Sequence, residues 1–508
     1  MSKASRTVLY LLGSVVLLLQ AVVSWVFVYE MIRSNMVPGI LLAIVVIILV
    51  LFEVVNILLF YRKAKKKKNK KTGEYISRKK RQKKHRIIAM VIAGIVIILC
   101  GFAAYIINKV NDTVDAITNE NGQEIEIGVY VMKDSPAQSL TDLIDGTFGM
   151  TESYDADNTK AALSDINSNL GKEVTTNSYN SVNEMIDALY GAQTDAIILN
   201  RAYEGVLEDQ DGYQSFTEDT RVVYTYKIKV EAEDKRDIKI TKDPFIVYIS
   251  GSDTRNDKLA TSRSDVNLLA VVNPTTKQVL LLNTPRDYYV HTSVSGDSKD
   301  KLTHAGIYGV QCSMDTLGML YDQTVDYSMQ INFTGFETLI DAIDGVAVDV
   351  DQSVTTDDGY SFSEGMNRMD GKEALSYVRE RHHFADGDNA RGRHQMAVIS
   401  AIIKKISSGT TILTHYSDIM DSMEGMFAMD LTGDDLGSLV KMQLSDNASW
   451  NVQSYAVTGE NSSGYTYSAP TQQLYVMEPD MDTVEHAKNL IDKVFAGEVL
   501  TDEDVASN

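Results

Sequence analysis

The chain has 508 residues and a formal net charge of −21, which leaves room for two or three domains as well as membrane segments. The charge is divided unevenly, because residues 1–109 hold 19 Lys and Arg against 3 Asp and Glu, and residues 110–508 hold 29 against 66. Nucleic-acid binding needs a broad basic surface, so this acidic part argues against a nucleic-acid partner. The two cysteines, Cys100 and Cys312, predict no disulfide, metal or redox centre.

Three apolar stretches open the chain, at residues 7–29, 37–60 and 87–108. Each is long enough to cross the ~30 Å hydrocarbon layer as a helix that rises about 1.5 Å per residue. A cleaved signal peptide would not be followed by two further stretches, and core helices this long seldom carry so few charges. Residues 1–109 are therefore predicted to form three transmembrane helices.

The segment 62–86 between the second and third stretches holds 15 Lys and Arg. A block this basic remains on the cytoplasmic side, which predicts a cell-membrane protein whose residues after Lys109 lie outside the cell. With only two cysteines in the chain, we expect these residues to lie on the outer face of a bacterial membrane. The basic block also suits anionic lipid or a cytoplasmic partner, and a role in topology alone explains it equally well.

A polar segment at 110–123 is predicted to be a stalk, and residues 124–232 are predicted to form a small α/β accessory domain. Its strands are expected at 124–132, 196–199 and 222–230, and its helices at 158–170 and 181–189. Ser181 and Glu184 have the spacing of a capping box. This domain shows no catalytic or metal-ligating pattern, so ligand capture, docking and a spacer role all stay open.

The second domain is predicted over residues 244–498, followed by an acidic tail at 499–508. Its nearly continuous apolar runs are typical of strands buried on both faces, which requires a sheet covered by helices. Strands are expected at 245–249, 266–272, 278–282, 327–331, 346–350 and 450–456. Helices are expected at 312–321, 333–343, 371–378, 390–405 and 481–495. The pattern predicts an α/β sandwich with a central mixed sheet flanked by helices.

Two carboxylates stand where the first two strands of this domain would meet. Asp253 follows one strand and Asp265 precedes the next, so pairing of the strands would bring both to one end of the sheet. Mg²⁺ uses one or two carboxylates together with phosphate oxygens and water, and these two residues suit it. Carboxylates in loops also form turns and caps, and that interpretation stays open.

Arginine is concentrated in the same domain. Of the 11 arginines after residue 109, 8 lie between Arg255 and Arg393. Arginine offers a rigid fork of donors suited to phosphate and keeps its charge at any working pH. An acidic chain that concentrates its guanidinium groups in this way is predicted to hold a more negative ligand there.

The densest part of the cluster lies at residues 379–395. Arg379 and Arg381 are two apart, so they can converge only if the preceding helix ends near residue 378 and the chain becomes extended. Asp388, Arg391 and Gln395 follow an i, i+3, i+7 spacing along one face of the next helix. That face could present a guanidinium and an amide to a phosphate, or it could be a surface helix with a solvated ion pair.

Several motifs occur in the order and spacing of one known family. They are Gly251-Ser-Asp-Thr-Arg255, Arg263-Ser-Asp265, Thr284-Pro-Arg-Asp287, Lys301-Leu-Thr-His-Ala305, Asn332-Phe-Thr-Gly-Phe336, Arg379-x-Arg381 and Asp388-x-x-Arg391-Gly-x-x-Gln395. On these residues the chain resembles the LytR-CpsA-Psr (LCP) family over about residues 243–405. The three apolar stretches and the added small domain look most like the CpsA-type members of streptococci and their relatives.

The resemblance implies a membrane-anchored, Mg²⁺-dependent phosphotransferase with an LCP-type fold. Such an enzyme moves a glycopolymer of the capsule or wall from a polyprenyl pyrophosphate carrier to peptidoglycan, and capsule-assembly proteins are further candidate partners. By motif, Asp253 and Asp265 look like the metal ligands, and Asp253 also like a catalytic group. The pyrophosphate clamp would comprise Arg286, Arg379, Arg381 and Arg391, and further substrate-binding candidates are Arg263, Lys301, Asp388 and Gln395.

This chemistry asks the protein mainly to position groups and stabilise charge. The acceptor hydroxyl also needs an acidic group to take its proton, for which Asp253 or Asp265 are candidates, whereas His304 suits packing as well as a base. Two rival functions use the same features. A pyrophosphatase would use water as the acceptor, and a non-enzymatic sensor would bind the lipid intermediate and signal through residues 62–86.

Overall fold

The computed structural model describes residues 3–506 apart from 64–66, 69–74, 77, 120–123, 153, 230–235, 253–261, 385–386, 409–418 and 420–425. The chain forms two compact units. The first contains Met1–Asp115 and Thr432–Asn447, and the second contains Ala116–Leu431 and Ala448–Asn508.

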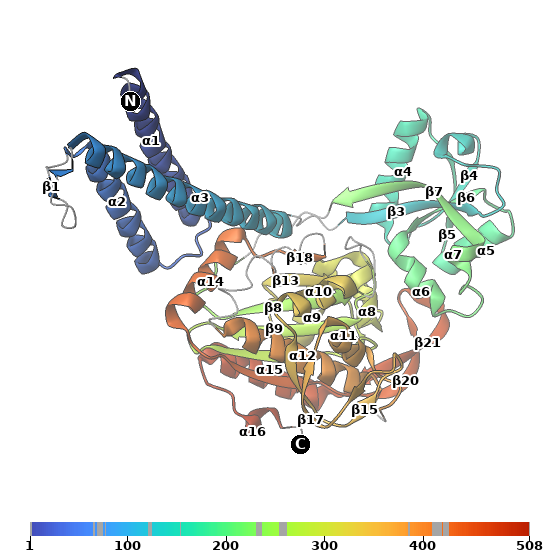
Figure 1. Cartoon of the computed structure of the whole chain (residues 1–508). Coiled ribbons are helices and arrows are strands. Elements are labelled where there is room, and N and C mark those ends of the chain that lie inside the picture. Colours follow the sequence, from blue (N-terminus) through green and yellow to red (C-terminus); the bar gives the residue numbers. More distant parts are fainter. Residues whose placement is uncertain are drawn as a thin grey trace. The chain divides into compact units, whose positions relative to one another are not determined.

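Three long helices make up most of the first unit: α1 (Lys3–Arg33), α2 (Gly39–Tyr61) and α3 (Arg78–Asn119) (Figure 1). Each contains a segment long and apolar enough to cross a membrane, and these are Thr7–Arg33, Gly39–Tyr61 and Arg81–Thr118. The three predicted helices are therefore confirmed, and each is long and apolar enough to cross a membrane.

The helix ends differ from the predicted bounds. α3 begins inside the basic segment 62–86 and continues to Asn119 through most of the predicted stalk. The earlier part of the basic segment contains two short paired strands, β1 (Lys67–Lys68) and β2 (Tyr75–Ile76). The first unit also contains α14 (Gly433–Asp446), which the sequence did not predict, and Asn35 Nδ2 donates to Ser438 Oγ of this helix at 3.3 Å.

The second unit begins with the predicted small α/β domain. Its sheet has the order β5–β4–β6–β3–β7, formed by β3 (Glu124–Met132), β4 (Thr147–Thr151), β5 (Thr175–Tyr179), β6 (Ala196–Asn200) and β7 (Thr220–Lys229). Helix α4 (Ala156–Leu170) packs on one face and α5 (Val182–Tyr190) on the other. Shorter helices are η1 (Leu140–Leu143), η2 (Arg201–Tyr203), α6 (Glu204–Glu208) and α7 (Phe216–Asp219).

The capping box predicted for α5 forms only in part. Ser181 Oγ accepts a hydrogen bond from Glu184 N at 3.2 Å, which is the expected half of the motif. The Glu184 carboxylate accepts instead from Asn180 N, one residue earlier than expected.

A six-stranded mixed sheet forms the centre of the second domain, in the order β18–β13–β8–β9–β10–β19. Figure 1 labels β18, β13, β8 and β9 of this sheet. Its strands are β8 (Phe245–Ser252), β9 (Val266–Asn273), β10 (Gln278–Asn283), β13 (Tyr327–Asn332), β18 (Phe427–Met429) and β19 (Asn451–Ala456). β8, β10, β13 and β19 run in one direction, and β9 and β18 run in the other. The predicted mixed sheet is confirmed.

Helices cover both faces of this sheet, as its doubly buried strands require. α9 (Val310–Tyr321) and α15 (Met481–Ala496) share one apolar cluster with it, and α12 (Asp388–Ser407) packs on the opposite face. The remaining long helices are α10 (Phe333–Ala342) and α11 (Gly371–Arg379). Short helices are α8 (Leu302–Ala305), η3 (Gly306–Tyr308) and α16 (Asp502–Val505), the last lying in the predicted acidic tail.

One predicted strand lies outside the central sheet. Residues 346–350 form β14 (Val346–Val350), which pairs antiparallel with β17 (Gly365–Met369) as a separate ribbon. Its burial alternates between buried valines and exposed residues, which is typical of an antiparallel ribbon with one solvated face. Smaller ribbons are formed by β11 (Tyr289–Val290) with β12 (Asp300–Lys301), β15 (Val354–Thr355) with β16 (Ser361–Phe362), and β20 (Gly459–Thr466) with β21 (Ala469–Pro479).

The core beneath α9 and α15 can be tested at Leu280 of β10, which is 0% exposed. Leu280→Ala removes buried apolar atoms and leaves a cavity, so we expect a loss of about 2–5 kcal/mol in the free energy of unfolding. Thermal unfolding of the detergent-solubilised chain, followed by circular dichroism, measures the loss. Met319→Ala, at a residue of α9 that is 54% exposed, is the control and should change stability by less than about 0.5 kcal/mol. Equal midpoints for the two variants would contradict this account of the core.

Candidate functional site

The candidate site lies at one edge of the six-stranded sheet, where β8, β10 and β13 have their carboxyl ends and β9 begins. In open α/β sheets such an edge is the usual place for a ligand. A cavity of about 340 Å³ opens there. The turn between β15 and β16, the end of α11 and the first half of α12 also line it.

Asp265 and Arg286 form the part of the wall nearest to the strand ends. Asp265 directly precedes β9, and Arg286 follows β10 by three residues. Arg286 Nη1 lies 2.5 Å from Asp265 Oδ1, and Arg286 Nε lies 3.5 Å from Asp287 Oδ2. The side chains of Arg286 and Asp265 are 14% and 23% exposed. This partly buried pair holds the guanidinium at the cavity while its charge is partly compensated.

Arg379 and Arg381 reach the cavity in the way that their spacing required. α11 ends at Arg379, and Glu380 has extended backbone dihedrals, φ −68° and ψ 127°. Both arginines then line the cavity. The Arg379 guanidinium lies 4.7 Å from the centre of the Phe333 ring, a cation–π contact that holds it without a carboxylate.

The side chain of Glu380 fixes this extended segment. Its carboxylate accepts hydrogen bonds from the backbone N–H of Asp357, His382 and His383 at 2.8, 2.8 and 3.2 Å. Burial opposes ionisation, but these amides, above all that of Asp357, together with a hydrogen bond from the His383 ring, outweigh it and hold the pKa of Glu380 below its usual value. The segment that carries both arginines is thereby tied to the β15–β16 turn.

Helix α12 supplies Arg391 and Gln395 to the same cavity. Between them, a Cβ at Gly392 would clash with the side chain of Asn283, so glycine lets the helix lie against the end of β10 without displacing Asn283. Of the three residues on the predicted helix face (Asp388, Arg391 and Gln395), the last two line the cavity. Asp388 is the first residue of α12, and its side chain lies outside the described residues.

A large part of the remaining cavity wall is apolar. It comprises Ile249, Val266, Ile331, Phe333, Phe336, Leu375, Val378 and Ile399. One cavity therefore presents guanidinium groups and apolar side chains together. Such a site suits a ligand with an anionic group attached to an apolar one.

The remaining predicted site residues lie elsewhere or outside the described residues. Asp253 and Arg255 fall within the gap 253–261. Arg263 pairs with Asp209 of the small domain, at 2.5 Å between Nη1 and Oδ2. Lys301 is buried and its Nζ lies 3.1 Å from Asp287 Oδ1, so this carboxylate stands between Lys301 and Arg286. In the described structure neither Arg263 nor Lys301 lines the cavity.

His304 is buried away from the cavity. Its Nδ1 lies 2.6 Å from Asp300 Oδ1, and Asp300 Oδ2 accepts hydrogen bonds from the backbone N–H and the hydroxyl of Ser468. His304 and Asp300 are 0% exposed. This network packs the β12–α8 segment against the β20–β21 ribbon, which agrees with the packing alternative for His304.

Motif reasoning gave no role to several residues that line the cavity: Asn332, Thr356, Asp357, Asp358, Ser376, Glu380 and His382. Asn332 could have been found, because it heads a quoted motif, and its side chain caps α10 by accepting from Gly335 N at 2.8 Å. The acidic turn at 357–358 had no sequence signal, since it reaches the cavity only through the β15–β16 ribbon.

A family model described as the LytR_cpsA_psr family matches residues 212–483, which is more than half of the chain. The chain belongs to the LytR-CpsA-Psr family. The matched residues include every described cavity residue from Asp265 to Gln395. The resemblance seen in the motifs is therefore confirmed.

Curated relatives include the polyisoprenyl-teichoic acid–peptidoglycan teichoic acid transferase TagU of Enterococcus faecalis, which is 34% identical over 211 residues, 41% of this chain and 68% of that protein. The TagT protein of Bacillus subtilis carries the same transferase name. It is 34% identical over 251 residues, which are 47% of this chain and 76% of that protein. A crystal structure of B. subtilis TagT is 28% identical and covers 52% of this chain and 94% of that one, with a TM-score of 0.39.

A second family model, described as a DNA polymerase processivity factor, matches residues 83–199. This range joins most of α3 to the first strands of the small domain and covers less than a quarter of the chain. It crosses the boundary between the two compact units and does not define a second family membership.

The pKa of Cys312 predicts how reactive its thiol is, and alkylation can test this prediction. Burial raises the pKa of this thiol to about 11, although Ser293 Oγ lies 3.3 Å from the sulfur. At pH 8 the thiolate fraction is then on the order of 0.1%, and it rises as the pH approaches 11. We expect no alkylation of Cys312 by iodoacetamide in the native chain at pH 8 and full alkylation after unfolding, as measured by peptide mass spectrometry. Rapid native alkylation would show an accessible thiolate instead.

Proposed function

We propose that this protein transfers a glycopolymer of the capsule or cell wall from a polyprenyl pyrophosphate carrier to peptidoglycan. One observation carries the proposal: four arginines from three separate chain segments, with Asp265, line a cavity that also has a large apolar wall. Membership in a family with curated relatives named as teichoic acid transferases supports the same reaction class.

The two walls of the cavity match the two parts of such a carrier. The diphosphate would lie against Arg286, Arg379, Arg381 and Arg391, because guanidinium groups bind phosphate oxygens through paired, charge-assisted hydrogen bonds. Arg379 and Arg381 have no ion-pair partner among the described residues, which leaves their charge for a ligand. The first prenyl units would contact the apolar wall at Phe333 and Phe336.

In the reaction, a peptidoglycan hydroxyl attacks the phosphorus that carries the glycan. A new P–O bond forms, the bond to the bridging oxygen breaks, and polyprenyl phosphate leaves. The arginines stabilise the negative charge on the phosphoryl oxygens during transfer. The hydroxyl proton passes to an acidic group, for which Asp265 is the candidate on the charged wall and Asp253 is a second candidate outside the described residues.

The donor set on this wall fits a Mg²⁺ ion. Asp265 uses Oδ1 for Arg286, and its other oxygen has no partner among the described residues, so it can face a cation. Asp253 would be the second carboxylate, as Mg²⁺ sites commonly use one or two together with substrate phosphates. When bound, Mg²⁺ would neutralise charge on the diphosphate oxygens.

The membrane helices would place this reaction at the cell surface. The basic segment between α2 and α3 favours the cytoplasmic side, so the residues after α3 would lie outside, where the carrier's glycan and peptidoglycan meet. Capsule-assembly proteins are proposed as further partners at this surface.

The clamp is tested by two arginines on α12. Arg391→Ala removes a guanidinium that lines the cavity, and we expect the transfer rate to fall about 10²–10³-fold. Arg393→Ala is the matched control, because Arg393 lies outside this cavity with its Nε 3.6 Å from Asp351 Oδ2, and it should transfer at nearly the wild-type rate. The assay follows transfer of labelled glycan from a synthetic polyprenyl pyrophosphate to peptidoglycan.

The products of this assay separate the rival functions. Glycan joined to peptidoglycan supports the transferase, whereas free phosphorylated glycan in equal yield with or without peptidoglycan would establish a pyrophosphatase. A chain that binds the carrier but forms neither product, and loses binding in Arg379→Ala/Arg381→Ala, would be a sensor.

Metal dependence gives a separate prediction. Treatment with a chelator should stop transfer, and Mg²⁺ alone should restore it. Asp265→Asn should lower the rate on the order of 100-fold and raise the Mg²⁺ concentration needed for half-maximal rate, because one ligand is weakened. Full activity in the chelator-treated chain would contradict the metal part of the proposal and leave the arginine clamp untouched.

A further inference from the structure

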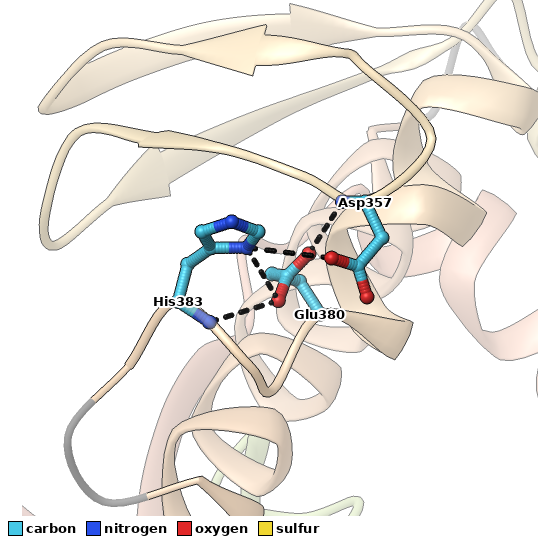
Figure 2. A group of neighbouring side chains, drawn as sticks. All are labelled: Asp357, Glu380 and His383. Atoms are coloured by element: carbon cyan, nitrogen blue, oxygen red, sulfur yellow. Dashed lines mark hydrogen bonds and ion pairs between the residues drawn. The ribbon is translucent and has the colours of Figure 1, made fainter.

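A second group of metal-ligating side chains lies on the rim of the cavity, apart from the arginine clamp. Figure 2 shows Asp357, from the turn between β15 and β16, facing Glu380 and His383 from the connection between α11 and α12. One ligand atom from each of the three lies within 4.8 Å of the others. Two chain segments that are 23 residues apart thus converge on one point.

Two distances within this group are close to the edges of a coordination shell. His383 Nδ1 lies 3.2 Å from Glu380 Oε1 and 3.7 Å from Asp357 Oδ1. A tetrahedral ion at about 2.0–2.2 Å from each ligand would hold its ligand atoms roughly 3.3–3.6 Å apart. The contact to Asp357 is longer than the ~2.7–3.2 Å of an N–H···O hydrogen bond, so these two atoms face each other as an ion pair without a hydrogen bond.

Both carboxylates are already oriented by other groups. His382 Nδ1 lies 2.6 Å from Asp357 Oδ2, the oxygen that faces away from His383, and this contact is a hydrogen bond. The Glu380 carboxylate is held by the three backbone amides described above and has a side chain that is 1% exposed. Outer contacts of this kind fix the direction of metal ligands in proteins.

The donor types select the class of ion. One imidazole nitrogen with two carboxylates suits a borderline transition metal such as Zn²⁺, whereas Mg²⁺ prefers oxygen ligands alone. Three protein ligands leave a coordination position for water or an anion. The side chains of Asp357 and His383 are 58% and 51% exposed, so an ion can reach the group from solvent.

We propose that Asp357, Glu380 and His383 bind one Zn²⁺ ion on the cavity rim. The ion would cross-link the β15–β16 turn to the segment that carries Arg379 and Arg381, and so hold both guanidinium groups at the cavity. This site is distinct from the Mg²⁺ site proposed at Asp265, and it does not depend on the function proposed above.

The test uses the full chain in detergent, freed of metal by a chelator and dialysed against a large excess of Mg²⁺. Equilibrium dialysis with Zn²⁺ should give one tight site per chain. His383→Gln and Asp357→Asn should each weaken that site roughly 100-fold or more, because each removes a ligand. Asp358→Asn, on the same turn but outside the group, is the matched control and should bind Zn²⁺ like the wild type.

Two further measurements distinguish the loss of a metal ligand from a loss of folding. The metal-free variants should unfold at the wild-type temperature, since the two exposed side chains add little to the core. Co²⁺ in place of Zn²⁺ should give a visible absorption band that His383→Gln abolishes. Unchanged Zn²⁺ binding in His383→Gln and Asp357→Asn, or equal weakening in Asp358→Asn, would overturn the proposal and leave a hydrogen-bonded ion-pair group.

Discussion

Repulsion between four guanidinium groups around one cavity is the constraint on which the rest of the site depends. Like charges that line one partly enclosed cavity repel one another, so each group needs a local source of stabilisation. Arg286 has Asp265 and Asp287, and Arg379 has the ring of Phe333. Arg379 and Arg381 have no ion-pair partner among the described residues, and an anionic ligand would lower the energy of this arrangement.

Strands and helices of the second domain hold the arginines of the cavity in place. The parallel strands β8, β10 and β13 end at one edge, so side chains that are far apart in the sequence start from neighbouring positions. Gly392 allows α12 to lie against the end of β10, and Glu380 ties the exit of α11 to the β15–β16 turn. Each contact limits the freedom of a segment that carries an arginine, which is the form of preorganisation that charge stabilisation requires.

The small domain contacts the domain that carries this site through Arg263, which the motifs had assigned to the substrate. Arg263, two residues before Asp265, pairs with Asp209, and apolar side chains of both domains share one cluster that includes Tyr203, Ile307 and Leu474. The segment that leads into β9 is therefore held from the side of the small domain. An arginine that is close in sequence to a predicted phosphate site can thus stabilise the fold instead of binding the ligand.

The sequence by itself determined the long apolar helices, most strands of the central sheet and the identity of the arginine cluster, because these depend on local hydrophobic period and on residue chemistry. It also required α11 to end where Arg379 and Arg381 could converge. Only the tertiary structure decided that residues 346–350 leave the central sheet, that Lys301 and Arg263 turn to Asp287 and Asp209, and that Asp357 reaches the cavity rim. These outcomes depend on which partner a strand or charge meets across long stretches of chain, and no local pattern encodes that choice.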